Sequence, residues 1–129
     1  MNENQNPCAA DYRFTGLTEI SPATIGPTVA PLCMPGEIIA HAYQSGQEYI
    51  LFTNRRLIHV GVCGEETPQR LFDFFPYRAL ISFAVENAQM LGVDNRLILR
   101  FADARLLSVS FSGGTDIVGL TRMLGGFVL

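Results

Sequence analysis

The sequence predicts a mainly β domain: a bent antiparallel sheet or small barrel of seven strands, capped by a C-terminal α-helix. Short runs of β-branched, aromatic and aliphatic residues, separated by polar breaks, recur between residues 37 and 111. The clearest pair flanks Asn54-Arg55, where asparagine tolerates the positive φ of a tight hairpin turn. After residue 114 the apolar residues change to a helical spacing.

Length and composition restrict the classes of function. A chain of 129 residues fits one domain, and a hydrophobic fraction of 48% can build a core. Only 16% of the residues are charged, below the usual quarter or so, which indicates that some surface is buried against other subunits. The net charge of −3 argues against a nucleic-acid binder or a binder of anionic membranes. All nine cations are arginine, a bias that suits interfaces and also a GC-rich genome.

The cysteines and the N-terminus indicate a cytoplasmic location. Cys8, Cys33 and Cys63 are odd in number and lack metal-ligand spacing, so we expect free thiols in a reducing compartment. Residues 1–12 form a polar leader with no signal-peptide pattern, and no apolar run is long enough to span a bilayer.

A short N-terminal extension, residues 13–36, precedes the regular part of the domain at 13–129. Ser21-Pro22 is a good helix start, with serine as the N-cap and proline at the first helical position. Because proline breaks helices, Pro27 should keep this helix short, and the rest of the extension should be irregular or extended.

The barrel is expected at residues 37–111. Its predicted strands are 37–43, 47–53, 56–62, 69–75, 78–86, 96–101 and 105–111, with polar loops at 63–67 and 87–95. The strand at 78–86 alternates clearly, with Ile81, Phe83 and Val85 on one face.

The capping helix is predicted at 115–126. Thr115 is a candidate N-cap, and Asp116 suits the positive end of the helix dipole. Ile117, Leu120 and Leu124 share one face, and Gly125-Gly126 should end the helix.

Several predicted strands are apolar on both faces, as in Leu97-Ile98-Leu99, and the helix can cover only part of this surface. One interpretation is an interface between subunits; the other is that the segment 14–34 packs over the strands. The candidate interface or ligand residues are Arg55, Arg56, Phe127, Val128 and Leu129. Charge reversal at Arg55 and Arg56 should then weaken assembly or partner binding.

Three stretches together resemble the bacterial pleckstrin-homology-like (PH-like) domain family. They are the hairpin Phe52-Thr53-Asn54-Arg55-Arg56-Leu57-Ile58, the segment Pro76-Tyr77-Arg78 through Asn87, and Phe111-Ser112-Gly113-Gly114-Thr115-Asp116-Ile117. The resemblance implies a PH-like barrel of seven strands with a C-terminal helix, in a bacterial protein. It also implies assembly into symmetric rings of identical subunits, but it brings no settled biochemical activity.

Phosphoinositide binding is not expected. Inositol-lipid binders place several basic residues around the first strand pair, but Ala42–Glu48 contains no cation. Eukaryotic PH domains typically carry a tryptophan in the C-terminal helix, and this chain contains no tryptophan.

No set of residues predicts catalysis, a metal site or a cofactor. His41 and His59 lie on predicted strands and are interpreted as structural, although Glu37 and Asp73 could approach them. Tyr77 is expected to be a buried polar anchor, and the glycines before Thr115 to be structural. The sequence therefore predicts a non-enzymatic module that assembles with itself or binds an unknown protein. The alternative is a binder of a small ligand or lipid headgroup at the open barrel end.

Overall fold

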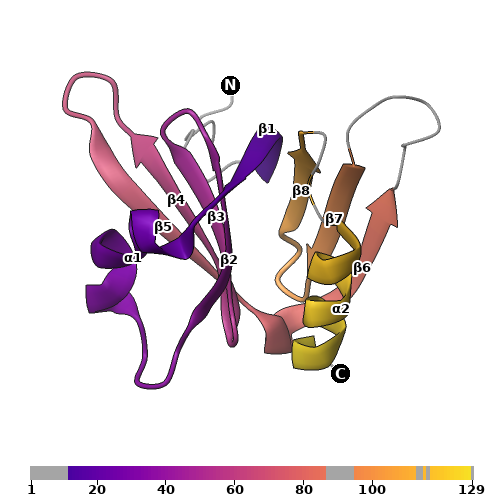
Figure 1. Ribbon diagram of the computed structural model, residues 1–129. Coiled ribbons are helices and arrows are strands. Elements are labelled where there is room, and N and C mark those ends of the chain that lie inside the picture. Colours follow the sequence, from indigo (N-terminus) through magenta and orange to yellow (C-terminus); the bar gives the residue numbers. More distant parts are fainter. Residues whose placement is uncertain (1–11, 87–94, 113–114, 116, 129) are drawn as a thin grey trace.

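The computed structural model describes residues 12–86, 95–112, 115 and 117–128, and within them eight strands form one curled sheet (Figure 1). The strands are β1 (Tyr12–Ile20), β2 (Ile39–Ser45), β3 (Glu48–Thr53), β4 (Arg56–Cys63), β5 (Gln69–Pro76), β6 (Leu80–Glu86), β7 (Asn95–Phe101) and β8 (Leu106–Phe111). The helices are α1 (Pro22–Val29) and α2 (Ile117–Val128), with 3-10 turns η1 (Ala30–Leu32) and η2 (Tyr77–Ala79). The predicted leader, up to residue 11, lies outside the described residues, as does most of the loop at 87–95.

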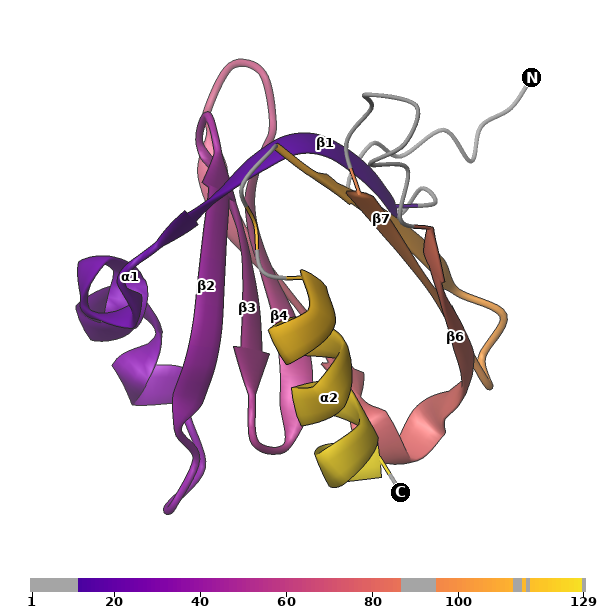
Figure 2. The same cartoon turned by 45° about the vertical axis from the view of Figure 1, so that its right-hand side comes forward.

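The expected seven strands correspond to β2–β8, and β1 is an eighth strand that the sequence did not predict. The strand order is β5-β4-β3-β2-β1-β8-β7-β6. β1 therefore joins two half-sheets, pairing antiparallel with β2 and parallel with β8, so the sheet is not purely antiparallel. Figure 2 shows β1 arching over the top of the molecule between the halves.

An irregular register hid β1 from the sequence pattern. The pairing with β8 shifts between Phe14 and Leu17, and Gly16 there has a φ of +68°. A bulge at this glycine breaks the two-residue period, so that Phe14 and Leu17 both contact the core although they are three positions apart. Of the two expectations for this part of the extension, irregular or extended chain, the extended one is correct, and Tyr12–Ile20 is a strand of the sheet.

The concave side of the sheet and α2 enclose the main core. Ile117, Leu120 and Leu124 of α2 are buried there, which confirms the predicted helical face. The sequence predicted that the helix ends at Gly125-Gly126, but α2 continues to Val128. Gly125 and Gly126 have room for a Cβ and no positive φ, so neither takes the left-handed conformation that would end the helix.

The convex side of β2–β5 is covered by α1. Ile25 and Val29 pack with a second buried cluster formed by Ala42, Leu51, Ile58 and Val60. Of the two interpretations of the two-sided apolar strands, packing by the segment 14–34 is therefore correct for this half-sheet. Ser21 caps α1 as predicted, accepting a hydrogen bond from Ala23 N, but the helix runs past Pro27 to Val29.

Two further expectations need correction. Phe83 and Val85 share one face as predicted, because they pair with the core residues Leu99 and Leu97, whereas Ile81 lies at the register shift between Leu80 and Ser82 and is 67% exposed. Cys63 is disulfide-bonded, which contradicts the expectation of free thiols, although Cys33 is a free thiol.

Candidate functional site

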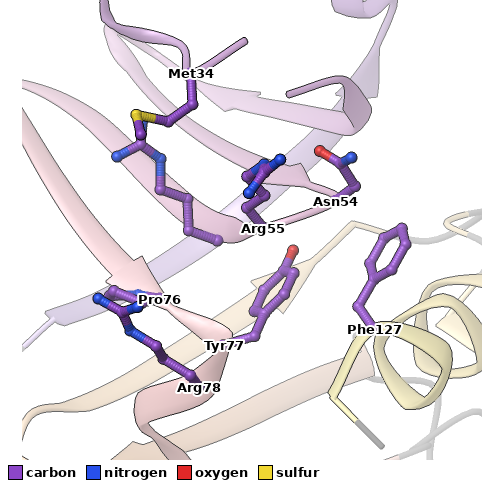
Figure 3. Close-up of a pocket in the computed structure, with 8 residues that line it drawn as sticks. Met34, Asn54, Arg55, Pro76, Tyr77, Arg78 and Phe127 are labelled. Carbon is purple, nitrogen blue, oxygen red and sulfur yellow. The ribbon is translucent and has the colours of Figure 1, made fainter. Parts of the chain in front are cut away.

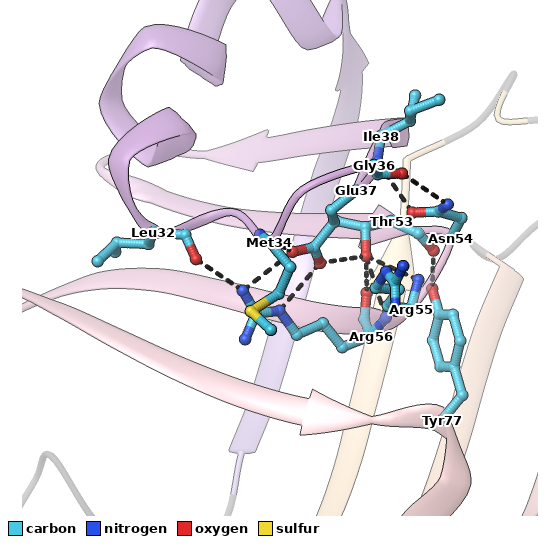
Figure 4. A network of polar contacts seen from close by, with 10 residues as sticks. All are labelled: Leu32, Met34, Gly36, Glu37, Ile38, Thr53, Asn54, Arg55, Arg56 and Tyr77. Carbon is cyan, nitrogen blue, oxygen red and sulfur yellow. Dashed lines mark hydrogen bonds and ion pairs between the residues drawn. The ribbon is translucent and has the colours of Figure 1, made fainter.

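The turn between β3 and β4 is held by the hydroxyl of Thr53, which is fully buried. Its oxygen accepts hydrogen bonds from the backbone N–H groups of Arg55 and Arg56, both at 3.0 Å. The same hydroxyl donates to Glu37 Oε2 at 2.7 Å (Figure 4). One short side chain thus satisfies the tip of the turn and ties it to the segment before β2.

Asn54 attaches the turn to the same segment through its side-chain amide. Its Oδ1 accepts from Ile38 N at 2.9 Å, and its Nδ2 donates to Gly36 O at 3.1 Å. The backbone N–H of Asn54 also donates to Ile38 O at 3.1 Å. These bonds, together with those of Thr53, fix the direction in which Arg55 leaves the chain.

Arg56 is neutralised by Glu37. The guanidinium donates from Nε to Oε2 at 2.9 Å and from Nη2 to Oε1 at 3.0 Å, and it also reaches Leu32 O at 2.9 Å. The Glu37 side chain is fully buried. Burial opposes its ionisation, but the hydrogen bonds from Met34 N, Thr53 and Arg56, with the Arg56 charge, hold the pKa of Glu37 below its usual value.

Tyr77, in η2, connects the turn to the corner between the half-sheets. Its hydroxyl donates to Thr53 O at 2.7 Å, and its backbone N–H donates to Arg55 O at 3.3 Å. Burial, and then the negative charge of Glu37, raise the pKa of Tyr77, so the phenol stays protonated as a donor. The predicted role of Tyr77 as a buried polar anchor is confirmed. Its ring lies nearly parallel to that of Phe127 at the end of α2, with centroids 6.0 Å apart.

These elements enclose a cavity of about 460 Å³, which we call the turn pocket (Figure 3). It is lined by Met34, Asn54, Arg55, Arg56, Pro76, Tyr77, Arg78 and Phe127. Arg55 and Arg78 are exposed, and neither forms an ion pair with a carboxylate among the described residues. The lining therefore carries three cations, of which Glu37 compensates one.

Three of the five candidate residues from the sequence, Arg55, Arg56 and Phe127, meet in the turn pocket. Val128 is the last residue of α2, and Leu129 lies outside the described residues. The sequence did not place Met34, Pro76 and Arg78 at this site. The motif Pro76-Tyr77-Arg78 was the available signal, because proline ends β5 and turns the chain toward the β3–β4 hairpin.

His59 is held inside the sheet by two carboxylates. Its Nε2 lies 2.6 Å from Glu48 Oε1, and its Nδ1 lies 3.0 Å from Asp73 Oδ2. The rings of Tyr12 and Phe14 lie against it, with centroids 5.7 and 4.6 Å away. With both ring nitrogens partnered and the side chain only 7% exposed, His59 matches its predicted structural role.

The rest of the described chain offers few groups that could bind a metal ion or act in acid–base catalysis. His41 Nδ1 lies 3.9 Å from Glu19 Oε2, and no group of three His, Cys, Asp or Glu side chains there could hold a metal ion. Neither described helix is long and apolar enough to cross a membrane. Gly113 and Gly114 lie outside the described residues, and the Thr115 hydroxyl donates a hydrogen bond to Ser112 O at 3.1 Å.

Comparison with known proteins places this fold. The family described as Bacterial PH domain matches residues 10–128. The uncharacterized protein YjqA of Bacillus subtilis (strain 168) is 31% identical over 119 residues, covering 88% of this chain and 93% of the relative.

Two solved structures are also similar. One is a DUF1696 family protein with a pleckstrin-homology domain from Shewanella loihica PV-4, with a TM-score of 0.77 and 27% identity, covering 89% of this chain and 99% of the other. The other is a pleckstrin homology domain from Shewanella amazonensis SB2B, with a TM-score of 0.66 and 25% identity, covering 87% and 91%.

A curled sheet whose open end is occupied by a C-terminal helix defines a PH-like domain. This chain belongs to the bacterial PH domain family. The fold and the resemblance predicted from the sequence are both confirmed.

Proposed function

We propose that this PH-like domain is a non-enzymatic interaction module that assembles with copies of itself through β6 and α2. The observation that carries the proposal is the apolar surface at this end of the sheet. The exposed Val85 and Val118 line a groove of about 230 Å³ between β6 and α2, and Ile81 is a further exposed apolar residue of β6. The groove is lined by Val85, Ile117, Val118, Thr121 and Arg122.

The topology favours a second copy as the occupant of this surface. β6 and β5 are the two ends of the sheet, so each has one edge without a strand partner among the described residues. Pairing of β6 in one subunit with β5 in the next would continue the sheet head to tail, and such contacts close into rings when the rotation allows. The low charged fraction of 16% also suits a chain that buries surface by association.

Light scattering over a dilution series tests the proposal. We expect a discrete multiple of 14.2 kDa that persists on dilution. Ile81→Glu should reduce it to the single-chain mass, because a buried unpaired carboxylate is strongly unfavourable at an interface. Ile38→Glu is the matched control, since Ile38 is 66% exposed and Ile81 67%, and it should keep the wild-type mass.

Two results would contradict self-assembly at this surface. One is a wild-type mass of 14.2 kDa at every concentration; the other is the same mass change in both glutamate variants.

The proposed location of the protein is the cytoplasm, although the disulfide at Cys63 is more usual in oxidising compartments.

A second candidate function, binding of a small ligand at the open barrel end, is favoured by the turn pocket. Its volume of about 460 Å³ is within the range of small-molecule sites, roughly 300–1,000 Å³. Because arginines and aromatic rings line this pocket, a ligand with an anionic group and an apolar group would suit it.

A further inference from the structure

Positive charge is concentrated in the turn pocket of a chain whose net charge is −3. Glu37 binds Arg56 through both carboxylate oxygens, so that pair contributes little net charge. The charges of Arg55 and Arg78 are not compensated, because neither forms an ion pair with a carboxylate among the described residues. A local field of this kind attracts anions to one cavity rather than to the whole surface.

The two uncompensated arginines come from segments that are fixed relative to each other. Thr53 and Asn54 hold the turn that carries Arg55, and the N–H of Tyr77 donates to Arg55 O next to Arg78. A site with a pre-arranged backbone loses less conformational entropy when it binds a ligand. The rest of the ordering cost is confined to the two arginine side chains.

Apolar and aromatic groups also line the turn pocket. Phe127 is 40% exposed and stacks on Tyr77, while Met34 is 54% exposed and Pro76 also lines the cavity. Exposed aromatic and thioether groups beside arginines suit a ligand with an anionic end and an apolar end (Figure 3).

We propose that the turn pocket binds a phosphate monoester carried on a small aromatic or apolar group. Arg55 and Arg78 hold the phosphate, and Phe127 contacts the apolar part. A phosphate monoester carries a charge of about −1.5 to −2 at pH 7, which matches two uncompensated guanidinium groups and their forked donors. This inference rests on the second candidate function and is independent of self-assembly.

Calorimetric titration of the whole chain with three probes tests the proposal. We expect saturable binding of phenyl phosphate, weaker binding of inorganic phosphate and no binding of benzyl alcohol. Arg55→Gln and Arg78→Gln should each weaken phenyl phosphate binding by about tenfold or more, because hydrogen bonds between charged groups are the strong ones. Phe127→Ala should weaken binding of phenyl phosphate but not of inorganic phosphate.

Arg100→Gln is the matched control, because Arg100 is an exposed arginine on β7 that makes no described ion pair. This variant should bind phenyl phosphate as the wild type does. The proposal is overturned if the wild type does not bind phenyl phosphate saturably, or if Arg100→Gln weakens binding as much as the pocket variants.

Vesicles distinguish a soluble ligand from a lipid headgroup. Phosphatidic acid presents a phosphate monoester at a membrane, and we expect no sedimentation with such vesicles above that with neutral ones, because the chain is acidic overall. Sedimentation that Arg55→Gln and Arg78→Gln abolish would support the same phosphate site with a lipid as its source.

Light scattering of the same variants separates the two proposals. Arg55 lines the turn pocket and not the groove between β6 and α2, so this proposal differs from the sequence-based expectation that Arg55 contributes to assembly. Arg55→Gln and Arg78→Gln should leave the assembly mass unchanged, and Ile81→Glu should leave phenyl phosphate binding unchanged. If the arginine variants dissociate the assembly and the wild type binds no phosphate, the arginines belong to the subunit interface and the ligand proposal is wrong.

Discussion

Glu37 determines which arginine of the hairpin is available for binding. Its buried carboxylate takes both hydrogen bonds from Arg56 and one from Thr53, so Arg56 becomes part of the scaffold. Arg55, the adjacent residue, points out of the same turn and remains exposed. Two neighbouring arginines therefore differ in role because only one of them reaches the carboxylate.

The stability of the turn should depend on pH through Glu37. Its pKa in the folded protein lies below the usual value of 4.5, so folding favours the ionised form. The stabilisation is therefore complete above about pH 4.5 and is lost as the pH falls through the lower, folded-state pKa. We expect Glu37→Gln to lower the free energy of unfolding by about 2 kcal/mol at pH 7, since it leaves Arg56 without its charged partner.

Urea unfolding between pH 7 and pH 3 measures this effect. The difference between wild type and Glu37→Gln should shrink as the solution is acidified. A constant difference over this range would mean that the carboxylate charge does not stabilise the turn. Glu86→Gln is the control for an exposed ion pair, with Arg96, and its effect at pH 7 should be well below that of Glu37→Gln.

The sequence identified Arg55 and Arg56 as one pair but could not separate their roles. Glu37 lies nineteen positions before Arg56. Glu65 and Glu66 lie closer to Arg56 in the sequence, yet among the described residues they make no ion pair with either arginine. Such a pairing depends on the segment before β2 lying beside the hairpin tip, which no local pattern specifies.

At the scale of elements, β4 carries a tightly packed polar cluster on an otherwise apolar strand. His59 is fixed by Glu48 from β3 and Asp73 from β5, so three adjacent strands are linked on the concave side. Gly61, two positions after His59, leaves room for the ring. A Cβ at Gly61 would lie 2.9 Å from both Cε1 and Nε2 of His59 and 3.3 Å from Glu48 Oε1.

Alanine substitutions at two glycines should therefore have opposite effects. Gly61→Ala should lower the free energy of unfolding by about 1–3 kcal/mol, because the new methyl group meets a ring that cannot move away. Gly125→Ala in α2 meets no heavy atom within 4 Å and should raise stability by ~0.5–1 kcal/mol through helix propensity. Thermal unfolding of both variants measures the two signs, and equal effects would contradict the crowding argument.

Most elements of the barrel were predictable because each short strand is bounded by its own turn. The hairpin around Asn54-Arg55 and the end of β5 at Pro76 are where the sequence predicted them. The helix limited by Pro27 is short, as predicted, and ends at Val29. The end of α2 was predicted wrongly, because the helix continues past Gly125-Gly126, and Phe127 in its last turn packs on Tyr77.

For the molecule as a whole, β1 and η2 join the two half-sheets at opposite ends. β1 bridges them through β2 and β8, and η2 is the chain connection between β5 and β6 (Figure 1). The turn pocket lies at the η2 end, where residues from both halves and from α2 meet. Its shape is therefore a property of the assembled fold, which is why the sequence supplied single residues of it but not the cavity.

The two half-sheets should unfold together because β1 is shared between them. Leu17 of β1 is fully buried in the core that both halves contribute, so Leu17→Ala should lower the free energy of unfolding by roughly 2–5 kcal/mol. Native-state hydrogen exchange should show the same loss of protection for the most protected amides of β4 and of β7. Leu32→Ala is the control, because Leu32 is 41% exposed and its truncation should change protection little in either strand. A loss confined to one strand would mean that the half-sheets are separate cooperative units, with β1 belonging to only one of them.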